Sequence, residues 1–246
     1  CSSDLLAMVL YGAGSAEMVD PFEPGKLSGA LPSGDYALAS GFSNPDLAAL
    51  GWILHSYKFT RYLTGKENSK SGECARLVCP DNVDRAGLLA RADAVMLGRD
   101  LINTPAEDMG PSQLETAVRG LARQFKAAVT VTKGVALEKK FPLIHAVGRA
   151  ADDAPRLLDL RWGVQQAPKV TLVGKGVCFD TGGLDLKPAS GMALMKKDMG
   201  GAAAVLSLAS MIMAARLNVR LRVLVPSVEN SVAGNAFRPG DILTSR

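Results

Sequence analysis

The chain has 246 residues, of which 48% are apolar and 21% are charged, and its formal net charge is +4. This length and apolar content are sufficient for one large or two modest globular domains with a sizeable core. The lysines and arginines are scattered, which argues against nucleic-acid binding, and no apolar run supplies the ~20 residues that a membrane span requires.

The cysteines and histidines argue against two further classes of site. The four cysteines are Cys1, Cys74, Cys79 and Cys178. They lack CxxC spacing and are too sparse for a disulfide framework, so we expect reduced thiols and a cytoplasmic location. Neither His55 nor His145 lies beside an acidic cluster, so both are predicted to be structural, and a histidine-type zinc site is not indicated. Any metal ion would be held mainly by oxygen ligands.

The first part of the chain contains one well-marked helix. Residues 1–40 are interrupted by Pro and Gly every few positions and predict mainly loop. Asn44, Pro45 and Asp46 form a helix start, and the apolar spacing that follows predicts an amphipathic helix to about Leu63. The other elements expected here are strands at 36–39 and 76–79 and a helix at 83–98.

The second part alternates strands with helices. Pro105 and Pro111 bracket a turn, which is the expected junction between two domains. The elements expected after it are a helix at 112–125, strands at 127–132, 143–148, 156–162 and 169–173, a helix at 200–215 and a strand at 219–225. This alternation is typical of an α/β layered fold with a mainly parallel central sheet.

The stretch 173–204 gathers the residues that indicate chemistry. Lys175 and Asp180 are expected in the loop that leaves the strand at 169–173, and Asp198 precedes a helix that opens with two glycines. Ligands collect at the carboxyl ends of strands in such sheets, so these three side chains are expected to meet at one edge. The positive end of the helix dipole would point to the same place.

Two alternatives compete with a functional interpretation of this stretch. In a purely structural interpretation, Lys175 is a solvated lysine, Asp180 forms a turn and Asp198 caps a helix, and spacing alone does not decide against this. A nucleotide-binding loop is the other alternative, because VGKG follows a strand. It fails in detail, since the GxxxxGK[ST] spacing is absent and a glycine follows Lys175.

Three segments resemble one known family. They are VGKGVCFDTGGLDLKP at 173–188, MALMKKDMGGAAAV at 192–205 and PSVENSVAGNAFRPGD at 226–241. They are similar to the catalytic domain of the cytosolic leucyl aminopeptidase family, whose members are two-metal exopeptidases. NTPAEDMGP at 103–111 and LHSYKFTRY at 54–62 are similar to the linker and N-terminal domain of that family. The resemblance begins at about Leu31 and continues to the last residue.

The resemblance implies a domain organisation. It predicts a partial N-terminal α/β domain over 1–80 and a linker helix and junction over 81–110. Residues 111–246 would form the N-terminal part of the metallo-aminopeptidase catalytic domain. The family completes its site with an Asn-Thr-Asp-Ala-Glu-Gly-Arg segment, and the sequence ends at Arg246 before that segment. We therefore expect a chain truncated at both ends.

The resemblance also implies roles for individual residues. Lys175, Asp180 and Asp198 would be metal ligands, with Asp180 bridging two divalent ions. Carboxylates suit Mn²⁺ or Zn²⁺, and two ions about 3.5–4 Å apart can activate a water molecule. Lys187 would be the catalytic lysine, binding the substrate and donating to the developing oxyanion. Met195 would line the pocket for the first side chain of the substrate, although an ordinary core methionine fits the sequence as well.

The function implied is a metal-dependent aminopeptidase that removes apolar, leucine-like residues from peptides with a free N-terminus. The absent segment would add two carboxylate ligands and an arginine that holds bicarbonate, so bicarbonate is expected only in the full-length protein, and the 246-residue chain is expected to be inactive alone. A homohexamer is implied. The alternative is a non-catalytic remnant, a binding protein or oligomer subunit that keeps the fold.

Overall fold

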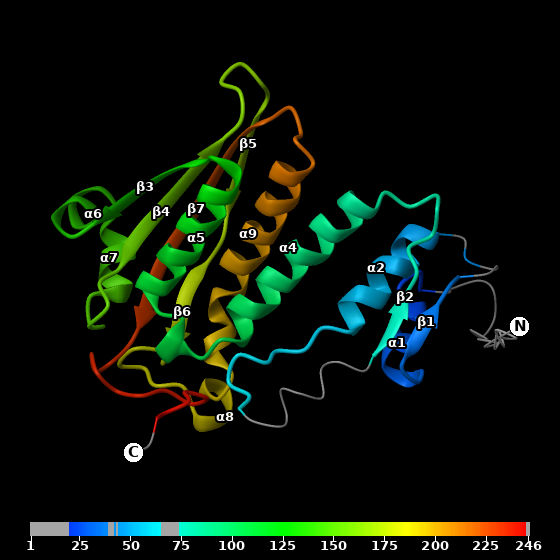
Figure 1. Cartoon of the computed structure of the whole chain (residues 1–246). Coiled ribbons are helices and arrows are strands. Elements are labelled where there is room, and N and C mark those ends of the chain that lie inside the picture. The colour runs from blue at the N-terminus through cyan, green and yellow to red at the C-terminus, as the bar shows by residue number, and fades with distance from the viewer. Residues whose placement is uncertain (1–19, 39–41, 43, 65–73, 245–246) are drawn as a thin grey trace, which may run out of the picture. The chain divides into compact units, whose positions relative to one another are not determined.

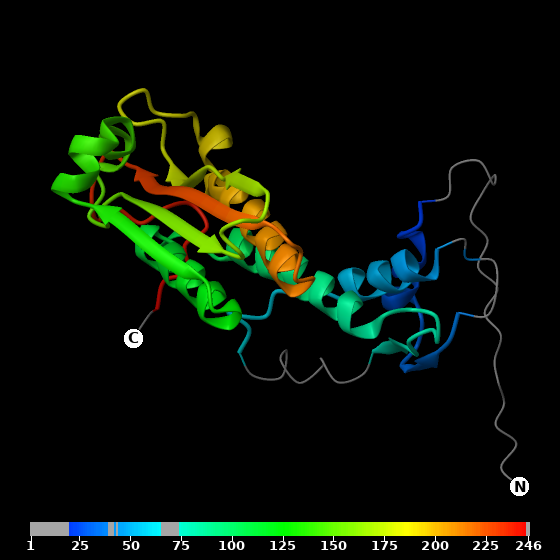
Figure 2. The same cartoon turned by 90° about the horizontal axis from the view of Figure 1, so that it is seen from above.

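The structure, a computed structural model, describes residues 20–38, 42, 44–64 and 74–244. It divides into two compact units, 1–88 and 89–246 (Figures 1 and 2). The division predicted at 1–80, 81–110 and 111–246 stays a prediction. In the described part of the chain, no helix combines the length and the apolar character needed to cross a lipid bilayer.

The first unit is small. Its elements are η1 (Glu23–Lys26), α1 (Leu27–Ala30), β1 (Gly34–Tyr36), α2 (Pro45–His55) and β2 (Ala75–Leu77). The strands β1 and β2 pair in parallel. Trp52 of α2 is buried and donates its indole N–H to the Ala75 carbonyl at 3.2 Å, which fixes the helix to the sheet. Residues 1–19 of the expected loop lie outside the described residues, and so does part of the strand expected at 36–39.

Helix α2 begins where the sequence predicts and ends earlier. The Asn44 side chain accepts a hydrogen bond from the Leu47 N–H at 3.0 Å, which is the expected N-cap. The expected end at Leu63 is wrong, because the helix stops at His55. The hydroxyl of the next residue, Ser56, donates to the Ile53 carbonyl at 2.8 Å and satisfies a backbone group of the last turn.

The second unit contains a five-stranded sheet and its helices. Its elements are α4 (Arg85–Asn103, which begins in the first unit), η3 (Ala106–Asp108), α5 (Pro111–Phe125), β3 (Ala128–Lys133), α6 (Val135–Lys140), α7 (Pro142–Gly148), β4 (Arg156–Trp162), β5 (Lys169–Val173), β6 (Gly176–Asp180), α8 (Ala189–Met192), η4 (Met195–Met199), α9 (Gly200–Ala214) and β7 (Arg220–Asn230). The elements expected at 76–79, 83–98, 112–125, 127–132, 156–162, 169–173, 200–215 and 219–225 are all present, several with shifted ends.

The sheet has the order β3-β4-β7, and β5 and β6 share the remaining side of β7. β4 is antiparallel to both of its neighbours, whereas β5 and β6 are parallel to β7. Four strands therefore run in one direction and β4 alone runs in the other (Figure 1). The α/β class is confirmed, and the described sheet is mixed, with two parallel and two antiparallel pairings.

Helices α5 and α9 pack on one face of this sheet. Alternate residues of the central strands point to them. The buried residues of this core include Leu158 and Leu160 of β4, Leu221, Val223 and Val225 of β7, Leu114 and Val118 of α5, and Leu206 of α9. Helix α7 lies against the other face, because a Cβ atom on its Gly148 would be 3.1 Å from the Val228 side chain. The neighbouring strand residue, Ser227, points to the opposite face and donates to the Pro111 carbonyl of α5, as expected from the alternation of side chains along a strand.

The strand expected at 143–148 is wrong, because these residues lie in α7. Pro142 occupies the first helical turn, where its missing N–H would have no partner in any case. The His145 N–H donates to the Phe141 carbonyl at 3.2 Å. Leu143 is 81% exposed, so the apolar run that resembles a strand is not buried. His145 is a partly exposed residue on a helix.

The loop expected around Asp180 is also wrong, because Gly176–Asp180 form β6 and continue the path of β5 along β7. Val173 lies opposite Leu224 and Gly176 lies opposite Ser227. The two strands are therefore one path along β7 that is interrupted at residues 174–175 (Figure 1).

Helix α9 holds this interruption in place. The N–H of Ala202 donates to the Lys175 carbonyl at 2.9 Å, so a helix amide replaces a strand partner. A Cβ atom on Gly174 would lie 2.6 Å from the carbonyl oxygen of Gly201, and a Cβ atom on Gly201 would lie 2.9 Å from the Lys175 backbone nitrogen, so both positions require glycine. The beginning of α9 therefore packs directly on the backbone that carries Lys175.

Candidate metal centre

A β-bulge positions Asp180 at the end of β6. Val177 pairs with Val228, but Asp180 pairs with Asn230, so the register shifts by one residue between them. Continuing the earlier register would put Asp180 opposite Ser231 instead. Because side chains alternate between the two faces of a sheet, a shift of one residue decides on which face a side chain lies. The bulge therefore places the Asp180 carboxylate beside the Asn230 side chain.

The two oxygens of Asp180 have different partners. Oδ1 accepts hydrogen bonds from the Asn230 side-chain amide at 2.7 Å and from the Gly182 N–H at 2.9 Å. Oδ2 lies 3.2 Å from Lys187 Nζ. Burial raises the pKa of Asp180, but these hydrogen bonds and the Lys187 ammonium together hold it below its ordinary value. Asp180 is thus an ionised carboxylate.

A tight loop returns Lys187 to the end of β6. Gly182 and Gly183 have φ values of +90° and +71°, a conformation that favours glycine. The loop closes where the Lys187 N–H donates to the Thr181 carbonyl at 3.0 Å. Thr181 is itself fixed to β7, because both its N–H and its hydroxyl donate to the Asn230 carbonyl, at 3.0 and 2.9 Å.

Lys175 and Asp198 form the second ion pair. Lys175 Nζ lies 2.8 Å from Asp198 Oδ1, and the lysine side chain is 60% exposed. Asp198 Oδ2 is buried and has no hydrogen-bond partner among the described residues. A buried carboxylate oxygen without a donor is costly, so this atom fits a position where a cation would bind.

The turn that carries Asp198 also carries Met195. Met195 opens η4 and is partly buried, whereas Met199 closes it and is fully buried in the core of the unit. Between them, Lys196 donates from Nζ to the Asn103 carbonyl at 2.7 Å, which ties η4 to the end of α4. The Asp198 turn is therefore held at both the core and the end of α4.

The structure thus brings the predicted residues together in two ion pairs, Lys175 with Asp198 and Lys187 with Asp180. In the described ranges, no group of three or more His, Cys, Asp or Glu side chains could hold a metal ion. The centre consists of two carboxylates and a lysine, whereas two ions would each require about four to six donors. These residues fit a part of a two-ion centre.

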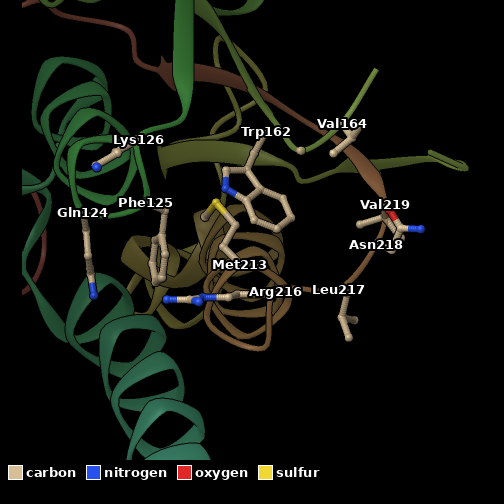
Figure 3. Close-up of a pocket in the computed structure, with 11 residues that line it drawn as sticks. Gln124, Phe125, Lys126, Trp162, Val164, Met213, Arg216, Leu217, Asn218 and Val219 are labelled. Atoms are coloured by element: carbon tan, nitrogen blue, oxygen red, sulfur yellow. The ribbon is translucent and has the colours of Figure 1, made fainter. Parts of the chain in front are cut away.

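Two cavities lie elsewhere in the same unit. One of about 500 Å³ lies between the ends of α5 and α9, where Phe125, Trp162, Met213 and Arg216 approach one another (Figure 3). The other, of about 540 Å³, is lined by the starts of β5 and β7 and by Arg161 and Trp162. Neither is lined by Lys175, Asp180, Lys187, Met195 or Asp198.

Sequence reasoning overlooked Asn230 and Thr181. The strand at 219–225 was expected to end before Pro226, but β7 continues through it to Asn230. The signal that could have found Asn230 is its position in PSVENSVAGNAFRPGD, one of the three segments that carry the resemblance.

Comparisons with known proteins relate this chain to one family. Residues 96–246 match the family model described as the cytosol aminopeptidase family, catalytic domain. Residues 2–80 match the M17 aminopeptidase N-terminal domain. The chain is 37% identical over 260 residues to a probable cytosol aminopeptidase of Rhodococcus opacus, covering 97% of this chain and 51% of that protein.

Solved structures give the same result. The cytosol aminopeptidase from Coxiella burnetii matches with a TM-score of 0.81 and 48% identity, over 90% of this chain and 48% of that one. The bottromycin maturation enzyme BotP, in complex with Mn, matches with a TM-score of 0.74 and 32% identity, over 90% and 50%. The chain spans about half the length of the curated relatives it matches.

Proposed function

Because the chain belongs to the cytosol aminopeptidase family, we propose that it carries part of the active site of a metal-dependent aminopeptidase. Its substrates would be peptides with a free N-terminus and an apolar, leucine-like first residue. The observation that carries this proposal is the buried Oδ2 of Asp198, which has no described donor and lies on a carboxylate already paired with Lys175.

Lys175, Asp180 and Asp198 are the proposed ligands of two divalent ions, with Asp180 bridging them. Mn²⁺ or Zn²⁺ suits these donors, and BotP, with 32% identity, has been solved with Mn. When bound, two such ions lower the pKa of a water molecule and polarise the scissile carbonyl. Lys175 can ligate only as the neutral amine, so binding would replace its ion pair with Asp198.

Lys187 is the proposed catalytic lysine. Its ammonium lies 3.2 Å from Asp180 Oδ2 and is held there by the Gly182–Gly183 loop. A protonated lysine in this place can donate to the carbonyl oxygen of the substrate as negative charge develops on it. Met195, on the same turn as Asp198, is proposed to contact the first side chain of the substrate.

The remaining parts of this function are family expectations. Further carboxylate ligands and an arginine that holds bicarbonate would come from outside these 246 residues. A homohexamer and a cytoplasmic location are proposed on the same ground, and the 246-residue chain by itself is expected to be inactive.

The test is an assay of the protein expressed from the whole reading frame that contains this chain. We expect hydrolysis of leucine p-nitroanilide with Mn²⁺ present, loss of hydrolysis with EDTA, and slow hydrolysis of an N-acetylated substrate. A protein that binds Mn²⁺ with normal affinity but hydrolyses no N-terminal residue would instead be a non-catalytic member of the family.

A further inference from the structure

We propose that Asn230 is a positioning residue for the metal centre. Its side-chain amide would fix the Asp180 carboxylate so that Oδ1 is occupied by protein donors and Oδ2 is left for metal binding. The inference rests on the proposed function, because Asp180 is a ligand only in that function. It concerns a residue at the end of β7, about fifty positions after Asp180 in the sequence.

The two oxygens of the Asp180 carboxylate have different hydrogen-bond partners. Both strong donors, Asn230 Nδ2 at 2.7 Å and the Gly182 N–H at 2.9 Å, point to Oδ1. Oδ2 has only the Lys187 ammonium, at 3.2 Å. A carboxylate held in this way cannot rotate to exchange its oxygens without breaking two hydrogen bonds. These two bonds therefore fix the orientation of the carboxylate, with one oxygen facing Lys187.

The orientation of the Asn230 amide is also fixed. A Cβ atom on Gly183 would lie 3.3 Å from Asn230 Oδ1, so the glycine leaves room for the amide oxygen on that side. The amide nitrogen is then directed to Asp180, where a carboxylate requires a donor. Asp180 thus selects one of the two amide orientations, and Gly183 leaves room for the side chain.

The Asn230 side chain is not needed to join the two strands. The Asn230 backbone carbonyl already accepts both the N–H and the hydroxyl of Thr181, at 3.0 and 2.9 Å. These bonds hold β6 to β7 beyond the bulge whatever side chain stands at position 230. Among the described residues, the side-chain amide donates to Asp180 alone, which separates a positioning role from a structural one.

This separation provides the experiment. Asn230→Ala removes the donor to Asp180. Ser231→Ala, at the next residue, removes two hydrogen bonds with the Ala233 backbone, at 2.6 and 3.3 Å, and leaves both donors to Asp180 in place. In the protein from the whole reading frame, Mn²⁺ binding is measured by EPR of the free ion, Co²⁺ binding by its visible absorption spectrum, and stability by thermal unfolding.

We expect Asn230→Ala to weaken Mn²⁺ binding about ten- to hundredfold and to alter the Co²⁺ spectrum, as loss of a partner of a metal ligand does elsewhere. Ser231→Ala should lower the unfolding temperature but keep affinity within about twofold and leave the spectrum unchanged, because both donors to Asp180 remain. Wild-type affinity and spectrum in Asn230→Ala would overturn the proposal, as would equal losses in both variants.

A wild-type protein that binds no Mn²⁺ would refute the proposed function, and the inference would then be tested without metal. In ¹⁵N-labelled protein, the side-chain amide protons of Asn230 should shift on Asp180→Ala, because their acceptor is removed. An unchanged Asn230 amide signal would show that the hydrogen bond does not form and would overturn the inference by itself.

Discussion

Two aspartates of the second unit differ in how fully their carboxylate oxygens are hydrogen-bonded. Asp159 of β4 uses both oxygens: Arg161 donates to them at 3.2 and 2.7 Å, and Arg222 of β7 at 3.1 and 2.9 Å. Asp198 uses one oxygen for Lys175, and its other oxygen is buried without a described donor. The first carboxylate has no capacity for a ligand, whereas the second does.

Cavity volume alone would select a different region from the proposed site. The cavity of about 540 Å³ is lined by Arg161 and Arg222, the two arginines that saturate Asp159. The proposed ligands lie at the carboxyl end of β6 and on η4, outside both cavities described above. Unsatisfied polar atoms and cavity volume therefore point to different places in this unit, and the proposed site follows the unsatisfied atoms.

The largest expected effect is on turnover, and it should distinguish Lys187 of the proposed site from Arg222, which pairs with Asp159. Lys187→Ala should lower kcat on leucine p-nitroanilide by about 10²–10³-fold, because a donor to the developing oxyanion is lost. Arg222→Ala is the matched control and should keep wild-type turnover. Both are measured in the protein from the whole reading frame, with metal content determined by mass spectrometry. Unchanged turnover in Lys187→Ala would remove this residue from the mechanism.

The next effect concerns metal affinity. Asp198→Asn should weaken Mn²⁺ binding by at least about tenfold, since even partners of ligands contribute that much. Asp159→Asn should leave it unchanged, because that carboxylate is fully used by two guanidinium groups. Titration calorimetry of the two variants compares them directly. Equal affinities would mean that the unpaired oxygen of Asp198 does not mark a metal position.

The free energy of unfolding should change more in Asp159→Asn than in Asp198→Asn, the reverse of the order expected for metal affinity. Asp159→Asn should cost about 1–2 kcal/mol of unfolding free energy, because two arginines lose their shared partner and Arg161 is already partly solvated. Asp198→Asn should cost less or stabilise the protein, since it removes charge from a buried oxygen without a donor. Urea unfolding of the wild type and both variants decides whether Asp198 is instead a structural residue.

The smallest effect is a dependence on acid. Burial raises the pKa of Asp159, but the Arg222 and Arg161 guanidinium groups together hold it below its ordinary value. A carboxyl whose folded-state pKa is lowered stabilises the protein above its unfolded pKa of about 3.9, and this stabilisation disappears as pH falls through the lower folded value. The stability difference between wild type and Asp159→Asn should therefore be constant from pH 7 to 5 and shrink below about pH 4. A constant difference down to pH 2 would contradict this.

Much of the fold follows from local sequence pattern. The strands at 156–162 and 169–173 have the predicted ends because their apolar residues are bounded by Pro155, Gly163 and Pro168. By contrast, Gly176–Asp180 contains a glycine and an aspartate beside further glycines, and forms a strand only because β7 supplies its partner. No local signal reports such a partner.

The sequence could predict which residues belong to the candidate site, but not how they are arranged. Lys175, Asp180, Lys187 and Asp198 could be selected from sequence. The bulge and the Asn230 contact could not, because Pro226 ordinarily ends a strand. Here the Leu224 carbonyl accepts from the Gly174 N–H, so alternate residues of β7 direct their backbone groups to that side. The backbone nitrogen of Pro226, which carries no hydrogen, therefore faces the interruption at 174–175. No strand hydrogen bond is lost there, because the strand path is already broken.

The shared use of β7 by β5 and β6 has a consequence for the order of folding. Among the described strands, β7 alone pairs with these two, and it lies about fifty residues further along the chain. Such non-local pairing forms slowly, because a long loop must close first. A chain leaving the ribosome that has emerged only as far as Ala214 would contain Lys175, Asp180, Lys187 and Asp198 but neither β7 nor Asn230. The metal centre would therefore form after its proposed ligands have been synthesised, when β7 joins the sheet.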